Sequence, residues 1–286
     1  MIQISREVLS LIFLEVSLGI SDRKTFGELL NQAKAFTDDY AALVGIGQVD
    51  FLLMLHGSLK THPLIDLPNI RLASAIRCHG LQGRSTYSSG LRNNAATMVS
   101  CLKVNPKVIS EKGFAALSTI FLPSLEQIGT KFASSDLTTD VYLTLGWPDI
   151  VLIITARDLD SALDALSEIR SIPSGEDSPK RFFLSTSFSE LFLKHRLDGE
   201  ELVLDGEISD SKFDFYMKVY CKPGGHISVA DNLKDYNPFF LLGKKDLGII
   251  RKSIDVAEYA RFVLDQREKN KKFLYATKTD IFFARR

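Results

Sequence analysis

The sequence predicts an α+β protein of three tandem ferredoxin-like domains, each an antiparallel sheet with the element order strand, helix, strand, strand, helix, strand. Three observations predict it. The phrase Gly-x-x-Asp, followed by an apolar run, occurs three times, with the aspartates at Asp50, Asp149 and Asp246. Each phrase joins two extended apolar stretches, as the turn of a β-hairpin does. Segments with helical apolar spacing flank the hairpins.

The second copy, residues 97–195, is the most complete. It starts with the strand TMVSCLKV and continues with the helical segment SEKGFAALSTIFLPSLEQIG, which Pro123 interrupts. The hairpin DVYLTLGWPDIVLIITA follows, and Asp158 is then placed to cap a helix with an apolar stripe. The strand RFFLSTSF is expected to close this copy.

The first copy, residues 1–80, opens with the strand VLSLIFLEVSL. A capping box at Thr25 and Glu28 predicts the start of its first helix. Its second helix is expected to be degenerate, because SLKTHPLIDLPN contains two prolines, and the strand IRLASAIRC closes the copy. The polar, Gly/Ser-rich residues 81–96 are the expected linker to the second copy.

The third copy, residues 212–286, starts with the strand FDFYMKVYC and ends with FLYATKTDIFF. Asp255 and Glu258 form the capping box of its second helix. The segment KPGGHISVADNLKDYNP is rich in helix breakers, so the first helix is expected to be degenerate. Residues 196–211 are expected to be a linker or an extra hairpin between the second and third copies.

The third strands, FLLML and IVLII, are apolar at every position, which predicts burial on both faces. The helix-free side of each sheet therefore needs a protein cover. The cover is either another copy from the same chain or the irregular segments of the degenerate copies. Because the number of copies is odd, the spare copy predicts a homo-oligomer, or contact with another protein chain through an exposed sheet face.

The composition limits the classes of binding partner and the cellular compartment that are expected. Lys+Arg and Asp+Glu both number 35, so the net charge is zero, and nucleic acid is not an expected partner. The basic excess between Arg251 and Arg286 is interpreted as a solvated helix end and loop. The cysteines Cys78, Cys101 and Cys221 have no metal-site or disulfide spacing, which favours reduced thiols in the cytoplasm.

Motifs of known chemistry are absent. GIGQVD lacks the third glycine of a dinucleotide fingerprint and leads into a strand, and phosphate-loop, nucleophile-elbow and zinc-protease patterns do not occur. No catalytic residue, metal site or cofactor is predicted. The N-terminal apolar run is interrupted by Glu15 and is too short to span a bilayer, so no membrane association is expected.

Over about residues 140–187, TLGWPDIVLIITARDLDSALDALSEIRSI resembles the effector-binding domain of the leucine-responsive regulator/AsnC family, without that family's helix-turn-helix. Gly146, Trp147 and Asp149 match the family's hairpin phrase. The resemblance implies a ferredoxin-like fold that dimerises through its sheet and binds amino acids near this hairpin. Tandem amino-acid-sensing domains of the ACT type are a similar alternative.

The functional expectation is therefore a non-enzymatic binding and oligomerisation protein that senses a small metabolite, such as an amino acid, at a domain interface. A scaffold subunit without a ligand and an enzyme with an unrecognised site are the alternatives. The candidate ligand-binding residues are Gly146, Trp147, Asp149, Gly47, Asp50, Gly243 and Asp246. Their structural alternative is that glycine supplies the turn conformation and aspartate hydrogen-bonds the turn backbone.

Overall fold

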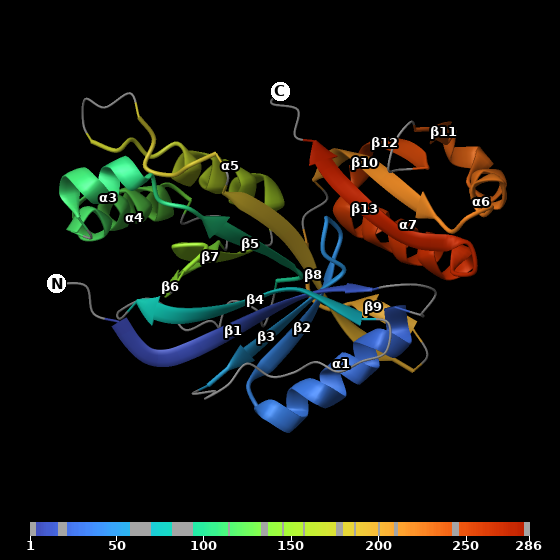
Figure 1. Ribbon diagram of the computed structural model, residues 1–286, viewed down its shortest axis with the longest axis horizontal. Helices are drawn as coiled ribbons and strands as arrows, with labels where there is room; N and C mark the ends of the chain where they lie inside the picture. The colour runs from blue at the N-terminus through green and yellow to red at the C-terminus, as the bar shows by residue number, and fades with distance from the viewer. Residues whose placement is uncertain are drawn as a thin grey trace.

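The computed structural model shows two antiparallel sheets with helices packed around them (Figure 1). The first sheet belongs to the N-terminal two thirds of the chain, and the second sheet belongs to the C-terminal third, which is orange to red in Figure 1. The residues that the structure describes are 4–16, 22–57, 70–81, 94–113, 115–132, 137–144, 146–156, 158–175, 180–185, 187–199, 201–208, 211–241 and 246–282.

The first sheet closes on itself. Its strands follow the order β2-β3-β1-β4-β6-β7-β5-β8, and β2 also pairs with β8, so eight strands form a closed antiparallel barrel. A ninth strand, β9 (Glu201–Leu204), extends β8 as a hairpin. The barrel strands are β1 Ile4–Val16, β2 Tyr40–Gly45, β3 Phe51–His56, β4 Ile70–Leu81, β5 Ala96–Leu102, β6 Thr138–Thr144, β7 Ile150–Ala156 and β8 Phe188–Asp198.

The barrel interior is filled with apolar side chains. On β3, Leu52 and Met54 point inward, whereas Phe51, Leu53 and Leu55 pack outside with residues of the first helix. All five are buried, so the predicted burial of FLLML on both faces is confirmed. The interior cluster is Leu9, Leu11, Phe13, Leu43, Leu52, Met54, Ile76, Cys78, Val99, Cys101, Tyr142, Val151, Ile153 and Phe192.

Helices cover the outside of the barrel. Helix α1 packs on β1, β2 and β3, and helices α3 to α5 lie with the strands of the second half of the barrel (Figure 1). As predicted, Asp158 caps α5, because its carboxylate accepts the Ser161 amide. The helices around the barrel are α1 Asp22–Phe36, α3 Pro106–Lys112, α4 Leu122–Lys131 and α5 Leu159–Arg170, with the π-helical turn η1 Leu117–Phe121.

The second sheet has the order β11-β12-β10-β13. Its inward-facing side chains pack in one core cluster with residues of α6 and α7. The predicted cap Asp255 accepts the Glu258 amide at 2.9 Å. The elements are β10 Lys212–Cys221, α6 His226–Asn232, the 3-10 turn η2 Lys234–Tyr236, β11 Phe239–Phe240, β12 Leu247–Asp255, α7 Val256–Asn270 and β13 Leu274–Phe282.

The opposite face of the second sheet is partly open. Tyr216 pairs with Ile250 across β10 and β12, and Ile250 is 50% exposed. The Phe239 ring stacks on Tyr216, with ring centroids 6.1 Å apart. Contact of an exposed sheet face with a second copy or another protein chain stays a prediction.

The prediction of three tandem ferredoxin-like domains is wrong. The strands assigned to the first two copies belong to one closed barrel with one shared interior. The physical reason is that the apolar strands need cover on both faces. Each half of the barrel has an apolar inner face, and the two halves bury these faces against each other. A chain pattern shows that a face needs covering, but it does not show that two sheets join at their edges.

Two local expectations also need correction. The strand that closes the second copy is not RFFLSTSF. It begins at Phe188, while Phe182 and Phe183 pack with Phe121 in the core. In the third copy a short first helix, α6, is present. The segment expected to hold a degenerate second helix in the first copy, residues 58–69, and most of residues 81–96 lie outside the described residues, and the domain boundaries stay predictions.

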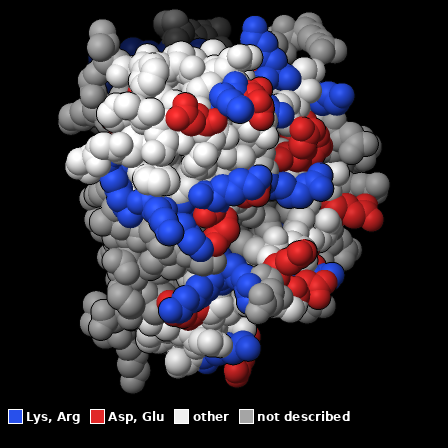
Figure 2. All heavy atoms as spheres, turned by 90° about the vertical axis from the view of Figure 1, so that its right-hand side faces the viewer, with Lys and Arg blue, Asp and Glu red and all other residues white. Residues whose placement is uncertain are grey.

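The surface on the side of α6 and the second sheet carries charges of both signs. Lys and Arg side chains form a band across this side, with Asp and Glu beside it (Figure 2). On α7, Lys269 pairs with Asp265 at 2.7 Å and Lys271 pairs with Glu268. Both pairs join residues three or four positions apart, which are neighbours on one helix face. Within the described ranges, no helix has both the length and the apolar character that a membrane crossing requires.

Candidate functional site

The three aspartates of the repeated phrase make the same local contact. Asp50, Asp149 and Asp246 each precede a strand, and each carboxylate accepts a backbone N–H from the end of the neighbouring strand or just beyond it. The donors are, in the same order, Val16 at 2.9 Å, Val104 at 2.8 Å and Cys221 at 2.7 Å. The contact satisfies an N–H that the ladder leaves free and fixes the turn.

Of the other predicted ligand-binding residues, the structure describes Gly146, Trp147 and Gly47. Gly146 has a φ of 116°, which suits glycine, and Trp147 is 49% exposed. The Trp147 ring stacks on Phe188 at 5.3 Å. Gly47 lies in the turn between β2 and β3, and Gly243 lies outside the described residues. Ligand contact by these residues stays a prediction.

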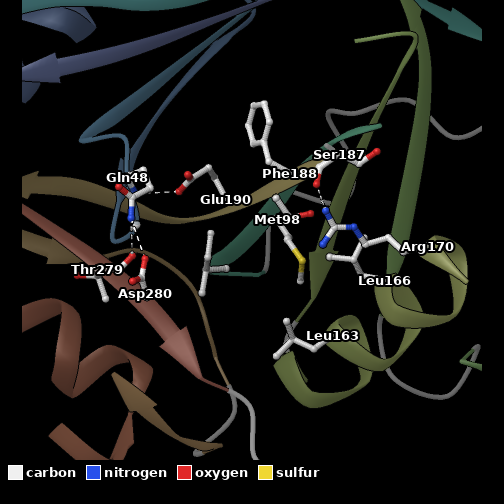
Figure 3. A pocket seen from close by; sticks show the side chains of 13 residues that line it. Gln48, Met98, Leu163, Leu166, Arg170, Ser187, Phe188, Glu190, Thr279 and Asp280 are labelled. Atoms are coloured by element: carbon white, nitrogen blue, oxygen red, sulfur yellow. Dashed lines mark hydrogen bonds between the residues drawn. The ribbon is translucent and has the colours of Figure 1, made fainter. Parts of the chain in front are cut away.

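A pocket of about 430 Å³ opens between α5, β5, β8, the β2–β3 turn and β13 (Figure 3). It lies where the barrel meets the second sheet. Among the predicted residues that the structure describes, only Gly47 lines it. The described lining residues are Gly47, Gln48, Met98, Leu163, Leu166, Arg170, Ser187, Phe188, Ser189, Glu190, Leu191, Thr279 and Asp280.

Two acids, Glu190 and Asp280, line the pocket, and Glu190 is the one with a strongly shifted pKa. Its carboxylate accepts the Gln48 amide N–H at 3.0 Å (Figure 3). Burial of the carboxylate raises the pKa of Glu190 from its ordinary value of 4.5 to about 7, against the hydrogen bond from Gln48 and the attraction of Lys278, which lower it. A carboxyl group with this pKa is present in both protonation states near neutral pH.

Arg170 is the positively charged group at the other end. It is the last residue of α5, and its guanidinium donates one hydrogen bond to the Ser187 carbonyl (Figure 3). Within the described part of the chain, no carboxylate lies at ion-pair distance from Arg170. Burial lowers the pKa of Arg170, because the guanidinium has lost contact with water and no carboxylate of the described residues replaces it.

The two barrel cysteines are not placed for reactivity. Cys78 and Cys101 lie in the barrel interior, where burial raises the pKa of both thiols, that of Cys101 to about 12. Thiols with such pKa values remain protonated and are poor nucleophiles and poor metal ligands. In the ranges described above, no cluster of His, Cys, Asp and Glu is arranged to hold a metal ion.

Sequence reasoning missed Glu190 and Arg170. Glu190 lies in SELFLKH, which was not recognised as a strand, and Arg170 reads as an ordinary basic residue at a helix C-terminus. The signal that was available is the single acid at the start of an otherwise apolar run, directly after Phe188 and Ser189. It does not reveal that the turn at Gly47 lies against it.

No protein family and no curated protein matches this chain. Among solved structures, the chain is similar to chlorite dismutase from Candidatus Nitrospira defluvii in complex with imidazole, with a TM-score of 0.46 and 10% identity over 66% of this chain and 91% of the other. It is also similar to a heme-binding protein from Thermus thermophilus, with a TM-score of 0.47 and 9% identity over 68% of this chain and 93% of the other.

These findings correct the family prediction. The resemblance to the leucine-responsive regulator/AsnC domain is wrong, because no family model matches the chain and its strands form one closed barrel rather than separate ferredoxin-like sheets. The expected non-enzymatic amino-acid sensor, which rested on that resemblance, is wrong with it. At this low identity the ligands and activities of the similar proteins are not transferred to this chain.

Heme does not fit the described lining of the pocket. Proteins hold heme iron through His, Cys or Tyr, or through Met together with His. The lining offers Met98 but no His, Cys or Tyr. The buried His195 is not part of the lining, and its ring contacts the Leu193 carbonyl at 3.1 Å.

Proposed function

We propose that the pocket binds a small organic acid through Arg170 and that Glu190 exchanges a proton with the bound molecule. The observation that supports this most directly is that Arg170, which has no acidic partner among the described residues, and Glu190 line the same pocket. A half-buried cation without a counter-ion is costly, and an anionic ligand would compensate it.

The geometry favours an elongated ligand with an anionic end. A guanidinium carries five N–H donors in a planar fork that matches a carboxylate, and Ser187 takes only one of them. Glu190 follows Ser187 by three positions, which is roughly 10 Å along an extended chain. Apolar side chains line the pocket as well, including Met98, Leu163, Leu166 and Leu191, so the body of the ligand is apolar.

Glu190 provides the chemistry. A general acid or base is most effective when its pKa lies near the working pH, and Glu190 meets this condition. In its protonated form it donates a hydrogen bond or a proton to a carbonyl oxygen of the ligand. In its ionised form it accepts a proton from a hydroxyl or an activated carbon. The proposed class of activity is proton transfer on an organic acid.

Binding is tested with a series of straight-chain monocarboxylates of increasing length, measured by calorimetry on the full chain. We expect affinity to rise with chain length until the pocket is filled. Arg170→Gln should weaken binding by about 10- to 100-fold, since charge-assisted hydrogen bonds contribute about 1.5–3 kcal/mol. Arg196→Gln, at an exposed position, is the matched control and should have no effect.

Proton exchange is tested through the pH dependence of the same binding. Proton uptake or release on binding should be measurable in buffers of different ionisation enthalpy near pH 7, and Glu190→Gln should abolish it. If no carboxylate binds, or if Arg170→Gln binds as well as the unmodified protein, the proposal is wrong.

A further inference from the structure

The turn between β2 and β3 is where three parts of the molecule meet. Gln48 donates its backbone N–H to Glu190 of β8 and its side-chain amide to Asp280 of β13, both at 3.0 Å (Figure 3). The same side-chain amide reaches the Thr279 carbonyl at 3.3 Å. In return, the Thr279 N–H donates to the Gly47 carbonyl at 3.1 Å. One turn thus contacts both Glu190 of the barrel and the second sheet.

Gly47 lets the carboxylate lie directly against the turn. A Cβ placed on Gly47 would lie 2.1 Å from Oε2 of Glu190, which is far inside contact distance. The atom in the way is the far end of a flexible side chain, so a larger residue would displace Glu190 without requiring the backbone to move. Glycine at position 47 therefore leaves room for the Glu190 carboxylate to lie against the turn.

A charge network underneath the turn holds the second sheet in place. Arg267 of α7 contacts Asp50 at 2.7 Å, and the Asp50 side chain is only 5% exposed. Lys278 of β13 lies 3.7 Å from both Asp50 and Glu15 and also donates to the Gln48 carbonyl. Both cations come from the C-terminal part of the chain, and both acids come from the barrel.

The charged groups that face Glu190 come from the same contacts. Lys278 lowers the pKa of Glu190, whereas Asp280 and Asp50 raise it. Cys101 of β5 is also close enough to interact with Glu190. The proton affinity of the Glu190 carboxyl group therefore depends on the position of β13 relative to the turn.

We propose that the Gly47–Gln48 turn is a latch through which docking of the second sheet positions Glu190 in the pocket. Gln48 is a positioning residue, because it acts through Glu190. The catalytic meaning of the latch rests on the proposed function, but the coupling itself is a property of the ligand-free protein and is measurable without a ligand.

The test is an NMR titration of the Glu190 carboxyl carbon in the full chain with labelled glutamate. Gln48→Ala keeps the backbone N–H but removes the contacts to β13. The N–H bond and the Lys278 attraction should both weaken, and the pKa of Glu190 should rise by about 0.5–1 unit. Asp280→Asn removes a repelling charge and should lower the pKa by a similar amount. Gln127→Ala, an exposed glutamine on α4, is the control.

Opposite shifts in Gln48→Ala and Asp280→Asn support the latch, whereas shifts in one direction, or none, overturn it. Gly47→Ala is a second variant, in which the amide proton of Gln48 should lose its hydrogen-bond shift while thermal stability changes little. An unchanged Gln48 amide in Gly47→Ala would also overturn the latch. If the opposite shifts are seen and no carboxylate binds, the latch stands and the proposed function falls.

Discussion

The two sheets of the molecule treat apolar residues differently. In β3 every residue from Phe51 to Leu55 is buried, because one face fills the barrel and the other lies under α1. In β10 buried residues alternate with partly exposed ones, and the open face shows Tyr216 and Lys218. The difference teaches that a continuous apolar strand marks a strand buried on both faces, whereas alternation marks a sheet with one free face.

The largest predicted effect is the difference in lost stability between alanine substitutions at two phenylalanines. Phe192 is fully buried in the barrel interior, and Phe239 is 38% exposed on the second sheet. Phe192→Ala should lower the free energy of unfolding by about 3–5 kcal/mol, because it leaves a cavity. Phe239→Ala should cost no more than about 1.5 kcal/mol, the size of an aromatic pair contact. Urea unfolding of both variants checks this, and equal losses would contradict the comparison.

The second largest loss of stability is expected from a substitution at the contact between the barrel and the second sheet. Arg267→Met removes one partner of the buried pair with Asp50, and we expect a loss of about 3 kcal/mol, because Asp50 is left without its closest cation. The double variant with Asp50→Asn should recover part of the loss. A double-mutant cycle in urea measures the coupling, and additive losses would show that the pair does not join the two parts.

A smaller effect is expected from pH. The folded pKa of Glu190, about 7, lies above the ordinary 4.5, so the unfolded chain releases the proton first as pH rises. The stability that protonation of Glu190 contributes is complete below pH 4.5 and is lost between pH 4.5 and 7. Because the group is partly accessible, the loss should be well below the limit of about 3 kcal/mol that the shift implies. Glu190→Gln should remove this part of the pH dependence, as urea titrations across the range would show.

The smallest effect should fall on the free face. Ile250 is 50% exposed, so Ile250→Asp should change the free energy of unfolding by less than about 0.5 kcal/mol. Light scattering on the same variant tests the predicted contact with a second copy. A loss of mass in solution would show that the open face is covered in an oligomer, and an unchanged mass would leave it to other partners.

Much of the local structure could be predicted from the sequence. The capping residues Asp158 and Asp255 and the burial of FLLML follow from short-range patterns, and the structure confirms them. The closed barrel could not be predicted, because it depends on pairings such as Leu43 with Lys194 between distant segments. The pocket was missed for the same reason, since Glu190 and Gln48 meet only after closure.

The seam between β2 and β8 has a consequence for synthesis of the chain. Leu43 leaves the ribosome long before its partner Lys194, so β2 waits with an unpaired edge and an uncovered apolar face. Such a nascent half is prone to association with other chains and is a natural client for chaperones. Completion of β8 then ends the exposure in one step, because the last seam removes the final open edge of the barrel.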